Sequence, residues 1–153
     1  MATFPVSLVT PERTLFEEEV QAVFLRTDAG ESAYMPGHTP LIGALAAGLV
    51  RFQREDDSEE RAAVHGGFVQ VEGDRVTVLA PVAELADDID VARARRAFDL
   101  ATQLVSDLTA IPAGAGDGAD ATQSDRELLD AEAARRRAEI RLEVAGALEA
   151  RAG

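Results

Sequence analysis

The chain has 153 residues with 28 acidic and 15 basic side chains, a formal net charge of −13 and no cysteine. That length suits one ordinary domain, or a small domain with an appended element. Disulfides and cysteine-ligated metal sites are excluded, and the acidic balance argues against binding to nucleic acids or anionic membranes.

The first predicted part of the chain is a β-domain over residues 1–86. It holds six of the seven aromatic residues and five of the six prolines, whereas residues 87–153 are richer in alanine. Aromatic and β-branched residues favour strands, and alanine with arginine, leucine and glutamate favours helices. We therefore place the boundary between a β-domain and a helical part near residues 86–88.

Within the β-domain, apolar residues recur at every second position, which is typical of strands. The alternation over residues 69–71 resumes over residues 76–78, which predicts a β-hairpin with Gly73 in its turn. The acidic run over residues 55–60 is expected to be a solvated turn. Further turn signals are Thr10-Pro11, Asp28-Ala29-Gly30, Pro36-Gly37 and Gly66-Gly67. Many short strands at this spacing predict an all-β sandwich or barrel.

A helical period of three and four residues then predicts a first helix over about residues 90–110. Asp90 stands at the N-cap position, where its carboxylate can accept a hydrogen bond from a first-turn N–H. The predicted apolar stripe consists of Ala94, Ala97, Phe98, Ala101, Leu104, Val105 and Leu108.

A flexible linker of small and acidic residues is expected over about residues 112–122, followed by a second helix over about residues 124–150. Ser124 and Glu127 have the spacing of a capping box. The predicted apolar stripe is thin: Leu129, Ala133, Ile140, Val144 and Leu148. Two such helices form an antiparallel hairpin that is weakly held, so that a partner can move it.

The sequence offers little catalytic chemistry. His38 and His65 are the only histidines, and their surroundings indicate no Ser/His/Asp arrangement. The chain has no lysine and so no phosphate-binding loop, and residues 55–60 lack the spacing of a calcium loop. No apolar run approaches the roughly 18 residues of a membrane span, and the first residues lack a signal peptide's basic start. We therefore expect a soluble, non-catalytic protein without a metal site or membrane insertion.

Five motifs resemble one family, in register along nearly the whole chain. They are Val9-Thr10-Pro11-Glu12, Met35-Pro36-Gly37-His38-Thr39-Pro40-Leu41, Leu45 with Gly48-Leu49-Val50, the hairpin of Gly66-Gly67-Phe68-Val69-Gln70-Val71 and Val76-Thr77-Val78-Leu79-Ala80, and the run from Glu84 to Ala94. Together with the β-then-helical layout, they are similar to the epsilon subunit of bacterial F-type ATP synthases.

The resemblance implies an N-terminal ten-stranded β-sandwich followed by a C-terminal antiparallel two-helix hairpin. It implies a non-catalytic subunit of the central-stalk rotor, which couples proton flow to ATP synthesis and inhibits ATP hydrolysis through its hairpin. The implied partners are the gamma subunit and the c-ring, with the alpha and beta subunits when the hairpin is extended. The implied location is peripheral, at the cytoplasmic face of the cell membrane.

The resemblance also implies three groups of site residues and no required cofactor, with ATP only as a regulatory ligand. The residues expected to meet the rotor neighbours are Pro36, Gly37, His38 and Pro40. The residues expected to bind ATP are Glu84, Ile89, Asp90, Arg93 and Ala94. The residues expected to grip the catalytic head are Arg135, Arg136, Arg137 and Arg141. Simpler roles stay open, because Asp90 is a good N-cap, Arg93 can pair with an acidic neighbour, and the four arginines can form a solvated face.

A different class of function remains as the alternative. The chain would then be a free-standing small-molecule (nucleotide) binding module, in which the β-sandwich uses the helical hairpin as a lid. An enzyme ranks third, because no constellation of residues supports it. A rotor subunit requires an exposed apolar patch for the gamma subunit, whereas a free module does not.

Overall fold

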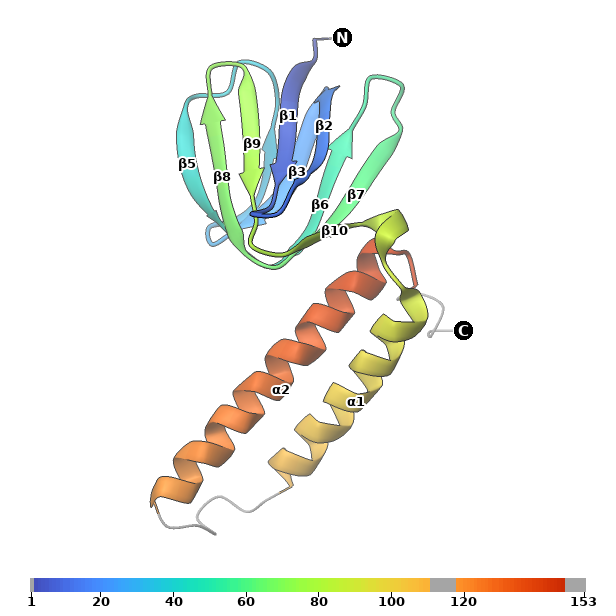
Figure 1. The fold of residues 1–153 in the computed structure, drawn as a ribbon. Coiled ribbons are helices and arrows are strands. Elements are labelled where there is room, and N and C mark those ends of the chain that lie inside the picture. Colours follow the sequence, from blue (N-terminus) through green and yellow to red (C-terminus); the bar gives the residue numbers. More distant parts are fainter. Residues whose placement is uncertain (1, 111–117, 148–153) are drawn as a thin grey trace. The chain divides into compact units, whose positions relative to one another are not determined.

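The computed structural model describes residues 2–110 and 118–147. The chain forms two compact units, residues 1–89 and residues 90–153. The first unit is built from strands and the second from two helices (Figure 1).

The strands of the first unit are β1 (Phe4–Val9), β2 (Thr14–Val20), β3 (Ala22–Thr27), β4 (Gly30–Tyr34), β5 (Leu41–Leu45), β6 (Gly48–Gln53), β7 (Glu59–Val64), β8 (Gly67–Glu72), β9 (Arg75–Leu79) and β10 (Ala83–Leu85). They form one sheet in the order β10-β7-β6-β3-β5-β8-β9-β1-β2, with β4 paired to β3. Neighbouring strands are antiparallel except β1 and β9, which are parallel. A short 3-10 helix, η1 (Ala86–Asp88), follows β10.

The sheet folds into two layers, so the first unit is the ten-stranded β-sandwich that the resemblance implied. One residue pair, Thr27 with Leu45, joins β3 to β5, and the layers separate at this point. The rings of Phe16 on β2 and Phe52 on β6 stack with centroids 4.4 Å apart, although these strands are not neighbours in the sheet. The core therefore lies between a layer containing β6 and a layer containing β2.

The predicted hairpin is confirmed as β8 and β9. Val69, Val71, Val76 and Val78 are buried in the core. Gly73 takes a positive φ of 59° at the first central position of the two-residue turn. A primed hairpin turn needs that conformation, which a side chain disfavours.

The acidic run is only partly the solvated turn that the sequence predicted. Glu59 and Glu60 already lie in β7 and are half-buried. Arg51 contacts Glu59 at 3.2 Å, and Arg54 contacts Glu60 at 3.6 Å. These guanidinium groups offset the like charges, so that the strand can include both carboxylates.

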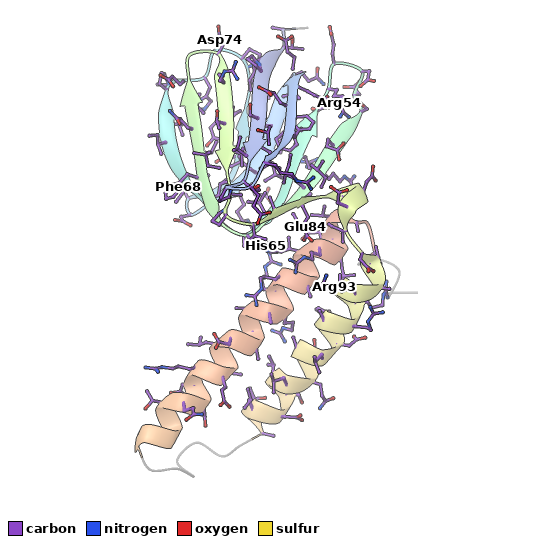
Figure 2. All side chains as sticks on the ribbon, viewed as in Figure 1. Arg54, His65, Phe68, Asp74, Glu84 and Arg93 are labelled. Atoms are coloured by element: carbon purple, nitrogen blue, oxygen red, sulfur yellow. The ribbon has the colours of Figure 1, made fainter. Side chains whose placement is uncertain are left out.

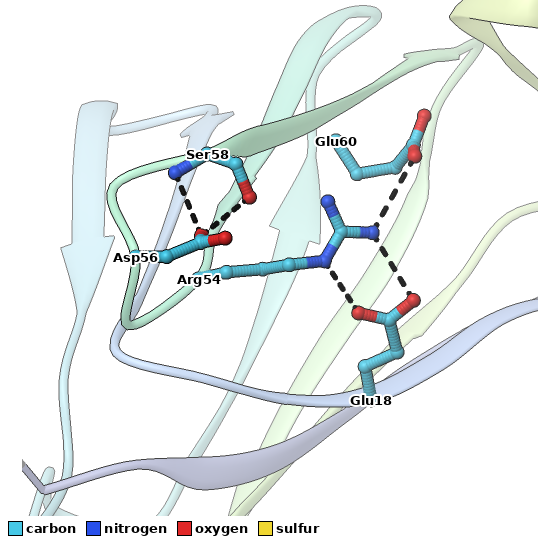
Figure 3. A network of polar contacts seen from close by, with 5 residues as sticks. All are labelled: Glu18, Arg54, Asp56, Ser58 and Glu60. Atoms are coloured by element: carbon cyan, nitrogen blue, oxygen red, sulfur yellow. Dashed lines mark hydrogen bonds and ion pairs between the residues drawn. The ribbon is translucent and has the colours of Figure 1, made fainter.

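Arg54 also joins the two layers (Figure 3). Its Nε donates to Glu18 on β2 at 2.6 Å and its Nη2 donates to the same carboxylate at 3.1 Å. This two-point hydrogen bond holds the pKa of Glu18 below its usual value and raises the pKa of Arg54. The contact crosses from the end of β6 to the edge strand of the other layer.

The second unit contains α1 (Val91–Thr109) and α2 (Gly118–Val144). The predicted N-cap is confirmed, because the Asp90 carboxylate accepts from the Arg93 N–H at 3.0 Å. The predicted start of the second helix near residue 124 is wrong, since α2 already includes residues 118–123. Alanine is the strongest helix former, and the alanines of this small-residue stretch favour helix over linker. Residues 112–117 of the predicted linker lie outside the described residues.

The predicted end of the second helix near residue 150 is also wrong. Gly146 takes a φ of 70°, and the N–H of Ala147 donates to the carbonyl of Leu142 at 2.8 Å. The N–H of Gly146 donates to Glu143 at 3.0 Å, which completes a Schellman motif. Helix α2 therefore ends at Val144. Residues 148–150 lie outside the described residues.

Helices α1 and α2 pack against each other along a seam with spacings of three and four residues. On α1 the residues of this seam are Val91, Ala94, Phe98, Ala101, Val105 and Leu108, all buried or half-buried. On α2 they include Leu128, Ala131, Arg135, Ala138, Leu142 and Ala145. The alanines at alternate seam positions leave little apolar area to bury.

Part of each predicted apolar stripe is wrong. Ala97 and Leu104 of α1 are exposed, as are Leu129 and Ala133 of α2. The packed faces combine alanines with leucines such as Leu128 and Leu142, so residue size alone does not mark them. Ile140 and Val144 are buried as predicted. Leu148 lies outside the described residues.

Candidate interaction surfaces

An apolar patch lies on the outer face of strands β5, β8 and β9. We define the patch as Ile42, Ala44, Phe68 and Leu79, all of them exposed. The register places Ala44 beside Phe68 and Phe68 beside Leu79, while Ile42 is two residues from Ala44 on the same face. Ile42 is 74% exposed and Phe68 is 56% exposed, so both present most of their surface to solvent.

This patch was not among the surfaces predicted from the sequence. In the sequence, this patch is visible as strands whose outward-facing residues are apolar, like their inward-facing ones. Phe68 faces outward next to the buried Val69, and Leu79 faces outward next to the buried Val78. A strand that faces solvent on one side ordinarily carries polar residues there. An outward apolar row on a rigid sheet is therefore the pattern of a protein–protein contact.

The proline–glycine–histidine loop joins β4 to β5 and presents the predicted rotor-contact residues. Met35, Pro36, Gly37 and Pro40 are exposed, and Gly37 takes a φ of 80°. His38 is half-buried. Its Nδ1 lies 3.0 Å from the carbonyl oxygen of Thr39, and its ring meets the ring of Tyr34 edge-on, with centroids 4.8 Å apart.

The proline–glycine–histidine loop, the β8–β9 turn and the β6–β7 turn all lie at the same end of the sandwich. Leu41 pairs with Val71, which brings the loop to the same end as the β8–β9 turn. Val23 pairs with both Tyr34 and Phe52, which adds the β6–β7 turn. This end is acidic, with Glu55, Asp56, Asp57, Glu72 and Asp74 in or beside the turns. Figure 2 shows Asp74 at this end and Phe68 toward the opposite end of the sandwich.

The predicted ATP-binding residues are divided between the two units. Glu84 is half-buried in β10, in register with Ala63 of β7, and Ile89 is buried at the end of the first unit. Asp90 caps α1, Arg93 is exposed on the first turn (Figure 2), and Ala94 is buried. ATP binding stays a prediction.

The four predicted arginines of α2 differ in exposure. Arg136 and Arg137 are exposed, and Arg136 pairs with Glu139 at 3.0 Å. Arg135 lies in the seam and, like Arg141, is half-buried. Two of the four are thus exposed, and the role of all four toward a catalytic head stays a prediction.

Among the described residues, no group of three acidic or histidine side chains is placed to hold a metal ion. None of the described helices has the length and apolarity that crossing a membrane requires.

The β-sandwich followed by a helical hairpin is a fold that the chain shares with known proteins. Residues 3–86 match the β-sandwich domain of the ATP synthase delta/epsilon chain. The chain is 38% identical over 146 residues to an ATP synthase epsilon chain of Halalkalibacterium halodurans, covering 95% of this chain and 99% of that relative. It is 44% identical over 100 residues to an ATP synthase epsilon chain of Streptomyces griseus, covering 65% and 81% of the two chains.

Solved structures share the fold. A chain in the structure of the Euglena gracilis mitochondrial ATP synthase matches with a TM-score of 0.63 at 22% identity, covering 100% of this chain and 83% of that chain. A chain of the Tetrahymena thermophila mitochondrial ATP synthase central stalk and c-ring matches with a TM-score of 0.51 at 11% identity, covering 92% and 95%. The chain belongs to the family of bacterial ATP synthase epsilon chains.

Proposed function

We propose that the chain acts as a non-catalytic subunit of the central-stalk rotor of a proton-translocating ATP synthase. In this role it couples proton flow to ATP synthesis and regulates ATP hydrolysis. It would reside at the cytoplasmic face of the cell membrane, held there by its partners. The observation that carries the proposal is the apolar patch on the outer face of β5, β8 and β9.

The gamma subunit is the proposed occupant of the apolar patch. Covering Ile42, Ala44, Phe68 and Leu79 would remove apolar surface from water, which favours association by about 25 cal/mol per Å² before the costs of binding. Strands β8 and β9 of the patch are paired on both sides, so force applied there is transmitted to a close-packed core. A free-standing nucleotide module gives no reason for this exposed row.

The proposed contact with the c-ring is the loop containing Pro36, Gly37, His38 and Pro40. The two prolines restrict its backbone, and the contact of His38 with Tyr34 ties the loop to β4. A loop held in this way loses little conformational entropy when a partner binds.

The proposed inhibitory element is the hairpin, which would contact the alpha and beta subunits when extended. Leu100 is 73% exposed and Leu129 is 64% exposed, so the hairpin leaves large apolar side chains uncovered. Arg136 and Arg137 add exposed positive charge to α2. ATP is proposed only as a regulatory ligand, with Arg93 as the phosphate partner.

The gamma contact is tested by binding of Phe68→Ser to an isolated gamma subunit. Truncating a central interface aromatic side chain costs about 2 kcal/mol or more, or about 30-fold in affinity. Leu129→Ser is the matched control, because it makes the same kind of change at a similarly exposed site outside the patch. Equal affinities of both variants and the unmodified chain would refute the gamma assignment.

The inhibitory role is tested by ATP hydrolysis of a matched catalytic head that lacks its epsilon subunit. Full-length chain and a version ending at Ile89, the end of the first unit, are added back in turn. Suppression by the full chain but not by the bound short version would support the role of the hairpin. If both bind and neither suppresses hydrolysis, the chain couples without inhibiting.

A further inference from the structure

We propose that His38 presents its Nε2 atom as a hydrogen-bond acceptor to a basic side chain of the partner that covers the acidic end of the sandwich. The identity of that partner as the c-ring rests on the proposed function. The hydrogen-bond polarity of His38 does not, because it follows from contacts within this chain.

The contact of Nδ1 fixes which ring nitrogen carries the proton. Nδ1 lies 3.0 Å from the carbonyl oxygen of Thr39. A carbonyl oxygen can only accept, so Nδ1 must donate. In the neutral imidazole one nitrogen donates and the other accepts, which leaves Nε2 with a lone pair. Nε2 makes no hydrogen bond with any residue in the described part of the chain.

The ring is also held in one orientation. Tyr34 is buried, and its ring meets the His38 ring at 67°. Edge-to-face contact of this kind is favourable for aromatic rings. The hydrogen bond to Thr39 and the contact with Tyr34 fix the imidazole from two sides. Its acceptor is thus positioned before any partner arrives.

The surrounding charge favours a cation as the donor. Asp74 lies in the β8–β9 turn between Glu72 and Arg75, and Asp56 and Asp57 lie in the β6–β7 turn at the same end. These four carboxylates outnumber Arg75 and Arg54, and Arg54 is already paired with Glu18 and Glu60. The combined negative potential of the four carboxylates would attract a guanidinium or ammonium group and repel a carboxylate. A basic side chain supplies both the N–H that Nε2 requires and the charge that this end of the sandwich favours.

Protonation of His38 should therefore oppose binding. The imidazolium donates from both nitrogens, so Nε2 would lose its acceptor and face the partner's cation with like charge. The titratable group in contact with the ring is the Tyr34 phenol, and Glu72 and Asp74 lie on the neighbouring turn. We expect affinity for the partner to be lower when the imidazole of His38 is protonated than when it is neutral.

The first test is the tautomer of His38 in the isolated full chain, read from nitrogen-15 NMR of the imidazole rings at about pH 8. The chain has two histidines, so the spectrum of His38→Gln assigns the signals. Protonated Nδ1 with unprotonated Nε2 is the expected result. A His38 ring that carries its proton on Nε2 would overturn the proposal without affecting the proposed function.

The second test is binding to a detergent-solubilised rotor of gamma subunit and c-ring, at about pH 8 and about pH 5.5. Glutamine can place an acceptor near the position of Nε2, whereas asparagine is too short to do so. His38→Gln should bind nearly as well as the unmodified chain and lose the pH dependence. His38→Asn should bind about 10-fold more weakly at about pH 8, as expected for one lost hydrogen bond to a charged group.

Each remaining outcome of the binding test has a definite meaning. Equal binding by the Gln and Asn variants, with unchanged pH dependence, overturns the role of Nε2 and leaves the proposed function standing. Affinity that does not respond to added salt overturns the assignment of a basic donor, since screening weakens exposed charge pairs. No binding by the unmodified chain at either pH overturns the proposed function and the partner assignment together.

Discussion

The sandwich and the hairpin are stabilised in different ways. The sandwich buries large side chains completely, among them Phe4, Leu8 and Phe52. The hairpin packs along a seam in which the buried Ala94, Ala101, Ala131 and Ala138 alternate with larger residues such as Leu142, while Leu100 and Leu129 are exposed. A buried leucine or phenylalanine contributes about 1.5–3 kcal/mol by burial, and an alanine methyl group much less.

This difference suggests that the sandwich and the hairpin have different roles. The sandwich has a core that specifies one structure, whereas the hairpin has a thin interface that a competing surface could replace at small cost. An element that moves in regulation is drawn from the less stable part of a protein. Perturbations of the sandwich core should therefore be severe, and perturbations of the hairpin mild and local.

Phe52→Ala should have the largest effect on stability. The side chain is fully buried and stacks on Phe16, so its loss leaves a cavity, and we expect about 3–5 kcal/mol of destabilisation. Urea unfolding followed by the fluorescence of Tyr34, the only tyrosine in a chain without tryptophan, measures this effect on the sandwich. Leu100→Ala on the hairpin is the control and should leave that transition unchanged. An equal shift of the urea midpoint in both variants would refute the difference in stability between the sandwich and the hairpin.

Gly67→Ala should rank next. Gly67 has a φ of 127°, and an added Cβ would lie 2.0 Å from the carbonyl oxygen of Leu79. Backbone strain of this kind costs about 1–3 kcal/mol, and the close approach adds to it. Gly48→Ala is the matched control, because it lacks a positive φ and its Cβ would meet nothing within 4 Å. The same urea unfolding curves test whether Gly67→Ala is the more destabilised variant.

Asp90→Ala should affect the hairpin alone. Removing an N-cap costs about 1 kcal/mol, and Asp90 caps the Arg93 N–H at the start of α1. Hydrogen exchange of first-turn amides of α1 should accelerate while β-strand amides keep their protection. Asp90→Asn, which retains a capping oxygen, should exchange like the unmodified chain. Faster exchange of the β-strand amides in Asp90→Ala would contradict the expectation that the sandwich and the hairpin respond independently.

The ion pair of Glu18 and Arg54 should have the smallest effect. The folded-state pKa of Glu18 is depressed, so its contribution is present above the unfolded pKa near 4.5 and is lost as pH falls through the lower folded value. The carboxylate is partly exposed, so we expect only about 0.2–1 kcal/mol at neutral pH. Glu18→Gln should be less stable than the unmodified chain at neutral pH, and the difference should vanish in acid. A difference that persists in acid would contradict the ionic origin.

Local signals in the sequence predicted much of the fold. Gly73 between alternating valines predicted the β8–β9 turn, and Asp90 before a helical period predicted the start of α1. Gly146 is likewise a local signal, for the end of a helix, and the predicted end near residue 150 overlooked it. The contact of Arg54 with Glu18 joins residues 36 apart in the chain and has no local signature.

The candidate surfaces were less predictable than the fold. The His38 loop was identified because its prolines and glycine are adjacent in the sequence. The apolar patch was missed because Ile42, Phe68 and Leu79 come from three strands, and only the register brings them together. The stripe of α2 was partly misplaced because its helical spacing was counted through Leu129 and Ala133, whereas the packed face runs through Leu128, Ala131 and Ala138.

The parallel pairing of β1 with β9 has a consequence for how the chain is made. Val6 pairs with Val76, a separation of 76 − 6 = 70 residues. Contacts this distant in sequence slow folding, because a long loop must close before they form. During synthesis the N-terminal strand must wait, with only β2 as a neighbour, until β9 has been translated. The sandwich therefore cannot complete its fold until β9 has been synthesised, and the helical hairpin is synthesised after that.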